Sequence, residues 1–596
     1  MDLKTFYTEK KDYYKQVNKL LNTRIFWLGW SRLLIFLGFG GCIFLFFRNN
    51  DPYGWLVLGF ILLVIFLFLV KTHIRLFDRR EAIRHLIQIN ENELNVLQNQ
   101  PSYLDDGAAF HNDTGYLPDL DVFGHRSLFH LLNRTATALG ENRLASLLQA
   151  PLSDRKIIEN QQVAIAELAQ TPDFRQHFLA QGLRTRVHPP DYKRLLAWID
   201  SSSEFLGSRF IRFVRIAMPA LFLIALFVSI FSKNLSPFLF MFFANFGVSG
   251  WYGHRITKIH AAISKNVESL GAFAELFKLV NSEKFQSNLL NQIHQETTEA
   301  HRQLSKLDTI ARFFDQRLNV VVYILLTGSI LYDIQCVFWL EKWKQRNQHR
   351  LRQWLNGIGE LEMLNSLATF RFNHPEYAMP TVSDGAPFIE ATDLAHPLIP
   401  AHERVSNDFK IGKDKRLYIV TGSNMSGKST FLRTVGVNVL LARCGAPVCA
   451  GSFSCSPMAI YSSLRQSDSL QDHVSTFYAE LRKLQGILEG LEEDAHALVL
   501  LDEVLRGTNS DDKLYGSQQL VKRLIDLGAV GLLATHDIEL AKMEAEYPQT
   551  LGNLCFESTI TGGDLLFDYK IREGVAQNRN ATFLMQKMGI IGRVSD

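Results

Sequence analysis

Cysteine is sparse in this chain, and its placement excludes several kinds of site. Six cysteines occur in 596 residues, and none forms a C-x-x-C pair or has a metal-type spacing from histidine. We therefore expect reduced thiols, as in a chain whose soluble part faces the cytosol, rather than a disulfide framework. The sequence also has no short-period repeat and no low-complexity tract.

Net charge is nearly absent as well. Lys and Arg number 63 against 60 Asp and Glu, which leaves a formal charge of +3. Bulk electrostatics therefore provides no attraction toward nucleic acid, although a basic patch can lie within a balanced total. The length allows about two to four domains, each with a sizeable core.

Phenylalanine is abundant, with 43 residues concentrated in apolar blocks. The first two blocks cover residues 33–47 and 53–70, and a short link containing Pro52 joins them. Each is close to the length that crosses about 30 Å of hydrocarbon as a helix, the first if it begins near Ile25. We therefore predict a transmembrane hairpin over residues 25–70. A cleaved signal peptide is excluded because a second span follows at once and no small-x-small cleavage site precedes it.

Basic residues flank this hairpin on both sides, whereas the link holds one Arg and one Asp. By the positive-inside rule, both ends of the hairpin are cytoplasmic. The flanking residues are Lys10, Lys11, Lys15, Lys19 and Arg24 before it, and Lys71, Arg75, Arg79, Arg80 and Arg84 after it.

A second pair of apolar runs covers residues 216–232 and 237–252, with arginines just before it and Arg255 and Lys258 after it. We predict a second hairpin over residues 210–253 and thus four spans, but these runs are shorter, so a pair of buried core helices is the alternative. The apolar stretch 319–340 is interrupted by Asp333 and Gln335, and we interpret it as a buried helix of the soluble part.

The remaining chain divides into a helical part and an α/β part. Residues 71–209 and 254–385 have apolar residues at helical spacing, the latter in long helices with few breakers. From about residue 386, continuous apolar runs at 416–421, 497–501 and 530–534 are bounded by turn residues. Such runs are typical of strands buried on both faces of a parallel sheet.

One glycine-rich segment has the pattern G-x-x-x-x-G-K-[ST], with an apolar strand before it and a helix after it, which is the context of a P-loop. The loop N–H groups and the helix N-terminus would surround the phosphates of ATP, Lys428 would neutralise β/γ-phosphate charge, and Ser429 would ligate Mg²⁺. The expected nucleotide-binding residues are Gly422, Ser423, Asn424, Met425, Ser426, Gly427, Lys428, Ser429 and Thr430.

Two carboxylates and a histidine follow at the ends of later strands. Asp502 and Glu503 end the strand ALVLL, and His536 ends VGLLA. Ligands collect at this edge of an open α/β sheet, so we expect Asp502 to hold Mg²⁺, Glu503 to activate the attacking water and His536 to contact the γ-phosphate. Alternatively the two acids are a solvated turn, or the histidine is structural. The order of loop, Asp-Glu pair and strand-end histidine is that of the ABC superclass of ATPases.

Several segments resemble the MutS family of DNA mismatch-repair ATPases. They are TGSNMSGKSTFLRTVG (421–436), STFYAEL (475–481), LLDEVLRGTNSDD (500–512) and ATHDIEL (534–540). The resemblance extends upstream to 120–152, 361–380, HPLI (396–399) and Asn407. No LSGG-type signature of ABC transporters precedes the Asp-Glu pair. The resemblance implies an α/β ATPase domain of ABC/MutS type at the C-terminus, preceded by a mainly α-helical core and lever region that carries the hairpins.

The resemblance also implies a homodimer formed through the ATPase domains, with Ser475 completing the partner's site in a C₂ arrangement. An ordinary helix N-cap is the alternative for Ser475. Only about 24 residues precede the first span, so we expect no mismatch-sensing domain. Nine cations of the lever helices are candidates for phosphate contacts with DNA, or form a solvated helix face. They are Arg302, Lys306, Arg312, Arg317, Lys342, Lys344, Arg346, Arg350 and Arg352.

These features together predict a multi-pass membrane protein with a cytoplasmic ATPase domain that uses ATP and Mg²⁺. The expected function is an ATP-dependent dimeric switch acting on DNA. The alternatives are a transport or membrane-remodelling machine, and a scaffold that does not hydrolyse ATP. The expected division is 1–24 N-terminal arm, 25–70 hairpin 1, 71–209 helical core, 210–253 hairpin 2, 254–385 helical lever and 386–596 ATPase domain.

Overall fold

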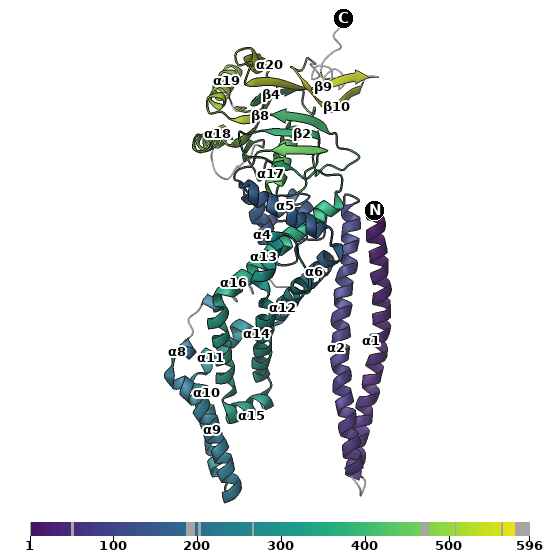
Figure 1. Ribbon diagram of the computed structural model, residues 1–596, viewed down its shortest axis with the longest axis vertical. Helices are drawn as coiled ribbons and strands as arrows, with labels where there is room; N and C mark the ends of the chain where they lie inside the picture. Colours follow the sequence, from purple (N-terminus) through teal and green to yellow (C-terminus); the bar gives the residue numbers. More distant parts are fainter. Residues whose placement is uncertain are drawn as a thin grey trace.

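The computed structural model has a head built on two β-sheets, a helical body, and two helical legs that extend from the body away from the head (Figure 1). It describes residues 2–48, 53–185, 197–200, 204–264, 267–465, 476–506, 508–561, 564–577 and 590. The chain is mostly helical, and the mixed α/β part lies in its C-terminal third.

The larger sheet of the head has six strands in the order β10-β9-β4-β8-β7-β6. All neighbouring strands are parallel except β9 and β10. Every residue of β4 and β8 is buried, which explains why their sequences are apolar throughout rather than alternating. The three predicted strands are confirmed as neighbours in this sheet. The strands are β4 (Leu417–Gly422), β6 (Ala459–Ser463), β7 (Ala497–Asp502), β8 (Val530–Thr535), β9 (Leu551–Thr561) and β10 (Asp564–Glu573).

A smaller sheet in the order β1-β5-β2-β3 lies between the larger sheet and the body. Helix α17 (Lys428–Arg443) contacts the segments after β2 and before β5 through Asn438. The Asn438 side chain donates to Ala395 O and accepts from Cys449 N. The smaller sheet contains β1 (Thr381–Val382), β2 (Ile389–Leu394), β3 (Asn407–Ile411) and β5 (Ser452–Cys455), and the other head helices are α18 (Thr476–Glu493), α19 (Ser510–Asp526), α20 (Ile538–Ala541) and η3 (Lys542–Ala545).

The body is organised around α16 (Tyr332–Asn373), a 42-residue helix that ends next to the head. Its buried Glu362 accepts hydrogen bonds from Ala136 N, Gly140 N and the Thr137 hydroxyl, and so fixes the start of α4. The other elements of the body are η1 (Ala108–Phe110), α3 (Leu128–Leu132), α4 (Ala138–Gln149), α5 (Arg155–Ala169), α6 (Pro172–Thr185), α11 (Gly253–Ser264), α12 (Val267–Ser282), α13 (Asn288–Thr297), α14 (Ala300–Asp315) and η2 (Gln316–Leu318).

Leg 1 is the hairpin of α1 (Leu3–Arg48) and α2 (Tyr53–Val96). Both helices continue without a break from the apolar part into the body, so the expected boundaries at 24/25 and 70/71 fall inside helices. The polar end of the hairpin is fastened to the body by buried polar contacts. Glu93 of α2 pairs with Arg134, with Nε and Oε1 2.5 Å apart, and the Tyr7 hydroxyl of α1 donates to Asn373 Oδ1 at 2.6 Å.

Leg 2 consists of α9 (Arg209–Ser232), α10 (Ser236–Trp251) and α15 (Val320–Ile330), with the short α8 (Glu204–Gly207) before α9. The prediction of one buried helix over 319–340 is wrong. Leu331 has a φ of 55°, and α15 makes an angle of 82° with α16. Asp333 and Gln335 both belong to α16, so α15 contains no charged residue. It packs on α10, where Asn245 donates to Gly328 O, and its other side is exposed.

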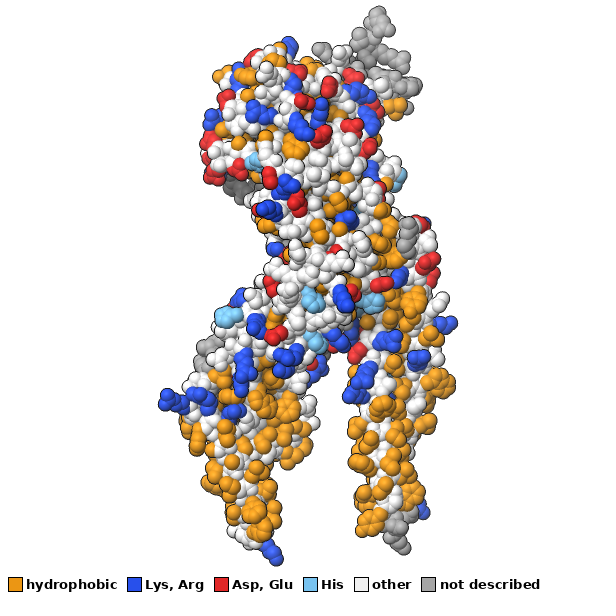
Figure 2. Space-filling view, in the orientation of Figure 1, with side chains coloured by type: hydrophobic (Ala, Val, Ile, Leu, Met, Phe, Trp, Pro, Cys, Tyr) orange, Lys and Arg blue, Asp and Glu red, His pale blue; other side chains and the backbone are white. Residues whose placement is uncertain are grey.

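The surfaces of the two legs are apolar, with Lys and Arg side chains gathered where each leg meets the body (Figure 2). Three helices of the described residues, α1, α2 and α9, are long and apolar enough to cross a membrane, and a fourth candidate is the bent pair α15 and α16. Helix α10 has 16 residues and is shorter than a typical span of about 20 residues.

Candidate functional site

The segment 422–429, here called the glycine loop, connects the buried end of β4 to the first turn of α17. Gly427 has a φ of 105°, in the left-handed region, and precedes a helix that begins without a side-chain cap. A Cβ on Gly422 would lie 2.8 Å from Ser426 Oγ and 2.9 Å from Phe556 O. Both glycines are therefore required by space or conformation, and the loop leaves backbone N–H groups at a helix N-terminus, where anions bind.

Lys428 lies within this loop and is almost fully buried. Its Nζ donates to Gly422 O at 2.8 Å and to Ser423 O at 3.0 Å. Burial lowers the pKa of the Lys428 ammonium, and the nearby Glu503 and Asp502 carboxylates oppose that change. The geometry places a cation directly beneath the loop.

Asp502 ends β7, and its register partner in β8 is Ala534, two residues before His536. Burial raises the pKa of Asp502, although a hydrogen bond with Ser429 opposes this. Its Oδ1 is buried and has no hydrogen-bond partner among the residues that the structure describes. A buried carboxylate oxygen without a partner next to a serine hydroxyl fits a site for Mg²⁺.

Glu503 and His536 form the closest contact of the site, with Glu503 Oε1 and His536 Nε2 2.6 Å apart. Arg506 Nε lies 2.9 Å from Glu503 Oε2, and Lys428 Nζ lies 3.5 Å from His536 Nε2. The hydrogen bond with His536 lowers the pKa of Glu503, in spite of burial. The parallel strands thus bring Lys428, Glu503 and His536 together, although Lys428 and His536 are 108 residues apart in the sequence, and the contacts keep Glu503 a carboxylate.

The turn after Glu503 is strained, with φ of 48° at Glu503 and 60° at Leu505. Glu480 of α18 accepts a hydrogen bond from Leu505 N at 2.6 Å. Glu480 belongs to the motif STFYAEL, but the sequence indicates no role for it, because no local pattern links it to a turn 25 residues later.

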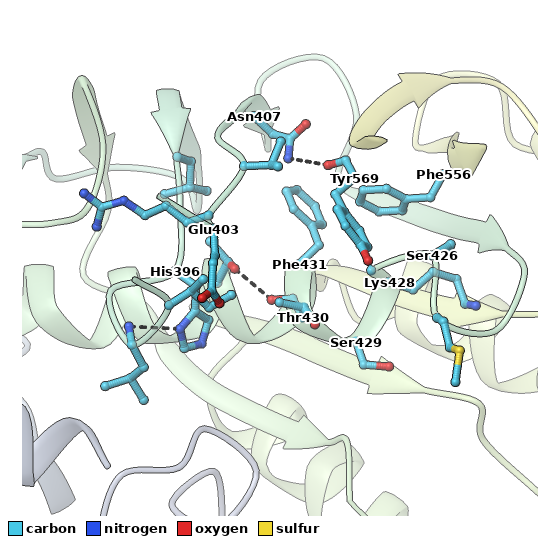
Figure 3. Close-up of a pocket in the computed structure, with 18 of the residues that line it drawn as sticks. His396, Glu403, Asn407, Ser426, Lys428, Ser429, Thr430, Phe431, Phe556 and Tyr569 are labelled. Atoms are coloured by element: carbon cyan, nitrogen blue, oxygen red, sulfur yellow. Dashed lines mark hydrogen bonds between the residues drawn. The ribbon is translucent and has the colours of Figure 1, made fainter. Parts of the chain in front are cut away.

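A cavity of about 540 Å³ opens beside the glycine loop, within the size range of small-molecule sites (Figure 3). The rings of Phe431, Phe556 and Tyr569 lie on one side of it and His396 on the other. Burial lowers the pKa of His396 to about 4, and Arg433 adds to this effect, so the imidazole is neutral at pH 7.

Tyr569 is a lining residue that the sequence did not indicate. It belongs to β10, and its backbone oxygen accepts a hydrogen bond from Asn407 Nδ2 at 3.1 Å. Its Cδ1 would lie 3.1 Å from a Cβ on Gly427, so this ring closes over the loop. Only the pairing of β10 with β9 brings it there.

The structure gathers most of the expected site residues in one place. Nine of the expected site residues line the cavity: Ser423, Asn424, Met425, Ser426, Gly427, Lys428, Ser429, Thr430 and Glu503. Ser475 lies outside the described residues. Within the described parts of the chain, no group of three or more His, Cys, Asp or Glu is placed to hold a metal ion. A Mg²⁺ ion here would therefore take most of its ligands from phosphate and water, as it does in many phosphate-binding sites.

Comparisons with known proteins agree with this architecture. Family models described as MutS domain III and MutS domain V match residues 93–368 and 418–590. Proteins named DNA mismatch repair protein MutS are similar over part of their length. That of Thermotoga petrophila is 32% identical over 241 residues, 40% of this chain and 30% of the relative.

Two further proteins with the same name are similar to a comparable extent. The protein of Thermotoga neapolitana is 34% identical over 36% of this chain and 27% of its own length, and that of Natronomonas pharaonis is 32% identical over 41% and 29%. The matched region thus spans under a third of each of these relatives.

Proposed function

The chain belongs to the MutS family, and on that premise we propose that it is a membrane-anchored, Mg²⁺-dependent ATPase whose nucleotide state controls its dimerisation. The observation that supports this best is the cluster of Lys428, Glu503 and His536 at the rim of the glycine loop. A buried cation, a carboxylate held ionised and a strand-end histidine are the groups needed to bind and hydrolyse a triphosphate.

Each residue has a distinct task in this proposal. The loop N–H groups and Lys428 bind the phosphates, and Lys428 exchanges its contacts with the Gly422 and Ser423 carbonyls for phosphate oxygens. Ser429 and Asp502 would hold Mg²⁺, which withdraws charge from the phosphates. Glu503 orients and deprotonates the attacking water, and His536, now against Glu503, turns to the γ-phosphate.

The aromatic rings line the side of the cavity where we expect the purine base of ATP to bind. Phe431 and Phe556 have ring centroids 5.8 Å apart, and Tyr569 lies beside them. A flat purine base, which can stack its faces on aromatic rings, fits between these rings and the neutral His396. Ser475 is proposed to reach the γ-phosphate of a second copy, so hydrolysis would require the dimer.

The membrane part of the proposal rests on the exposed apolar legs. Contiguous apolar surface of this extent is rare on soluble monomers, and the Lys and Arg side chains at its upper edge match the cytoplasmic border of a bilayer. Dimerisation of the heads would then move the body and, through Glu93 and Tyr7, leg 1.

Two variants test the ATPase. Lys428→Ala should abolish nucleotide retention, and Glu503→Gln should retain ATP and lengthen the dimer lifetime while turnover falls about 100-fold or more. Wild-type nucleotide binding by Lys428→Ala, measured with a fluorescent ATP analogue on detergent-purified protein, would refute the assigned site.

DNA is the proposed partner of the switch, by family relation. We expect one or more of homoduplex, mismatched and branched DNA to stimulate ATP turnover above the rate without DNA. Equal rates in all four reactions would remove DNA from the proposal and leave the ATPase intact.

A further inference from the structure

The nine cations of the lever helices do not form one surface. Arg312, Arg317, Arg350 and Arg352 pair with Asp308, Asp333, Glu299 and Asp200, and Lys344 is buried and donates to Trp198 O. The four that remain have no ion pair among the described residues, and all four line a single groove: Arg302, Lys306, Lys342 and Arg346.

This groove, of about 630 Å³, runs between α14 and α16 and has no acidic residue in its lining. Arg302 and Lys306 are one turn apart on α14, as are Lys342 and Arg346 on α16, so each pair lies on one face of its helix. Trp339, Trp343 and Asn347 form the rest of the α16 wall. Four exposed cations facing each other without counter-charges repel one another, and an anionic ligand would relieve that repulsion.

The position of the groove identifies the ligand class. Below it, η2 leads into the exposed apolar helix α15, which lies nearly perpendicular to α16. At its lower end, the half-exposed rings of Phe313 and Trp339 have centroids 6.2 Å apart. With a rise of about 1.5 Å per residue, Trp339 lies roughly 10 Å and Arg346 roughly 20 Å along α16 from its start at Tyr332.

The surface therefore changes from apolar to aromatic to basic along one line away from leg 2. That order is the order of a membrane interface, where rings lie at the headgroup level and cations lie just outside it. A nucleic-acid groove has no need of an apolar helix at its floor. We propose that the α14–α16 groove binds the anionic headgroups of phospholipids in the leaflet that faces the head; this rests on the membrane anchoring proposed above.

The test uses the full chain in neutral detergent, titrated with dioctanoyl phosphatidylglycerol or dioctanoyl phosphatidylcholine. Intrinsic tryptophan fluorescence, to which Trp339 and Trp343 contribute, and thermal shift report binding. We expect the anionic lipid to bind at least about 10-fold more tightly than the zwitterionic one, and replacement of all four groove cations by Gln to remove that preference.

A matched control replaces four exposed cations of the head and body, Lys156, Lys410, Lys413 and Lys542, by Gln. It makes the same change in net charge and should bind the anionic lipid as wild type does. Equal loss in the control would show a bulk charge effect and overturn the proposal.

Three other results would also overturn it. Equal binding of both lipids removes the headgroup preference, and equal binding of glycerol 3-phosphate, which has no acyl chains, assigns the groove to a soluble phosphate. Loss of duplex DNA binding in the groove variant, with lipid binding unchanged, assigns it to nucleic acid. The titration works in detergent, so it is independent of membrane insertion, which protease protection at Lys233 in reconstituted vesicles tests separately.

Discussion

The strands β4 and β8 of the head and the helices of the legs are both rich in apolar residues, but they are covered in opposite ways. In the head, all six residues of β4 and of β8 are buried by neighbouring strands and helices. In leg 2, Leu223 of α9 is 63% exposed, and leg 1 is similarly bare. Apolar sequence alone therefore does not say what covers it. The head covers its apolar residues with its own chain, whereas we propose that the legs rely on lipid.

Leg 1, which we propose lipid covers, is fastened to the body by contacts buried within the chain. Substitutions at these contacts should have the largest effect on stability. Glu93→Ala leaves the Arg134 guanidinium buried without its partner, which should cost about 3–5 kcal/mol of unfolding free energy. Denaturant unfolding in detergent measures this.

An exposed pair on the same hairpin is the control for that change. Lys15 and Glu91 are 2.8 Å apart but about half exposed. Lys15→Ala should therefore cost less than about 1 kcal/mol. Similar losses in the two variants would mean that burial does not distinguish the two pairs.

An arginine placed on a leg tests directly whether lipid covers that leg. Leu223→Arg should cost about 2.5–3.5 kcal/mol if α9 spans the bilayer. Val163→Arg, at a residue of α5 that is 56% exposed on the body, should cost less than about 0.5 kcal/mol. The readout is the fraction of reconstituted chains in which Lys233 is protected from trypsin added on the head side, together with thermal stability. If both arginines are tolerated alike, α9 does not span the bilayer.

The head should also show a pH dependence that the legs lack. His396 has a pKa of about 4 in the folded chain because it is buried, against about 6.5 when unfolded. Between these values the unfolded state binds more protons, so stability falls as the pH falls. From pH 7 to 5 the loss is about 2 kcal/mol. The free energy of unfolding is measured at pH 7 and at pH 5. In His396→Asn the difference between the two values should be smaller by this amount. An unchanged difference would show that other groups cause the pH dependence.

The smallest effect is expected at Glu480. Glu480→Ala leaves Leu505 N without its acceptor and loosens the turn that aims Glu503. ATP turnover should fall about tenfold, with little change in nucleotide affinity. Glu480→Gln keeps a carbonyl acceptor and should recover most of the rate. A parallel loss of affinity in Glu480→Ala would indicate general damage to the site instead.

Much of the head was predictable because its signals are local. The runs at 416–421, 497–501 and 530–534 each became a strand of one parallel sheet, and that sheet brings Lys428, Glu503 and His536 together. Tyr569 and the contact of Glu480 were not predictable, because each depends on the meeting of segments with no shared pattern. The break at Leu331 was missed because a φ of 55° at a leucine has no sequence signal.

The sequence by itself determined the glycine loop, the strand-end carboxylates and histidine, and the apolar runs, since each is a pattern of residue types along a short stretch. Only the tertiary structure decided which of the nine lever cations have no ion pair within the described part of the chain and that these four share one groove. Pairing depends on acids brought from distant segments, such as Glu299 beside Arg350 and Asp200 beside Arg352. Coulomb attraction acts over a few ångströms of space, regardless of separation along the chain.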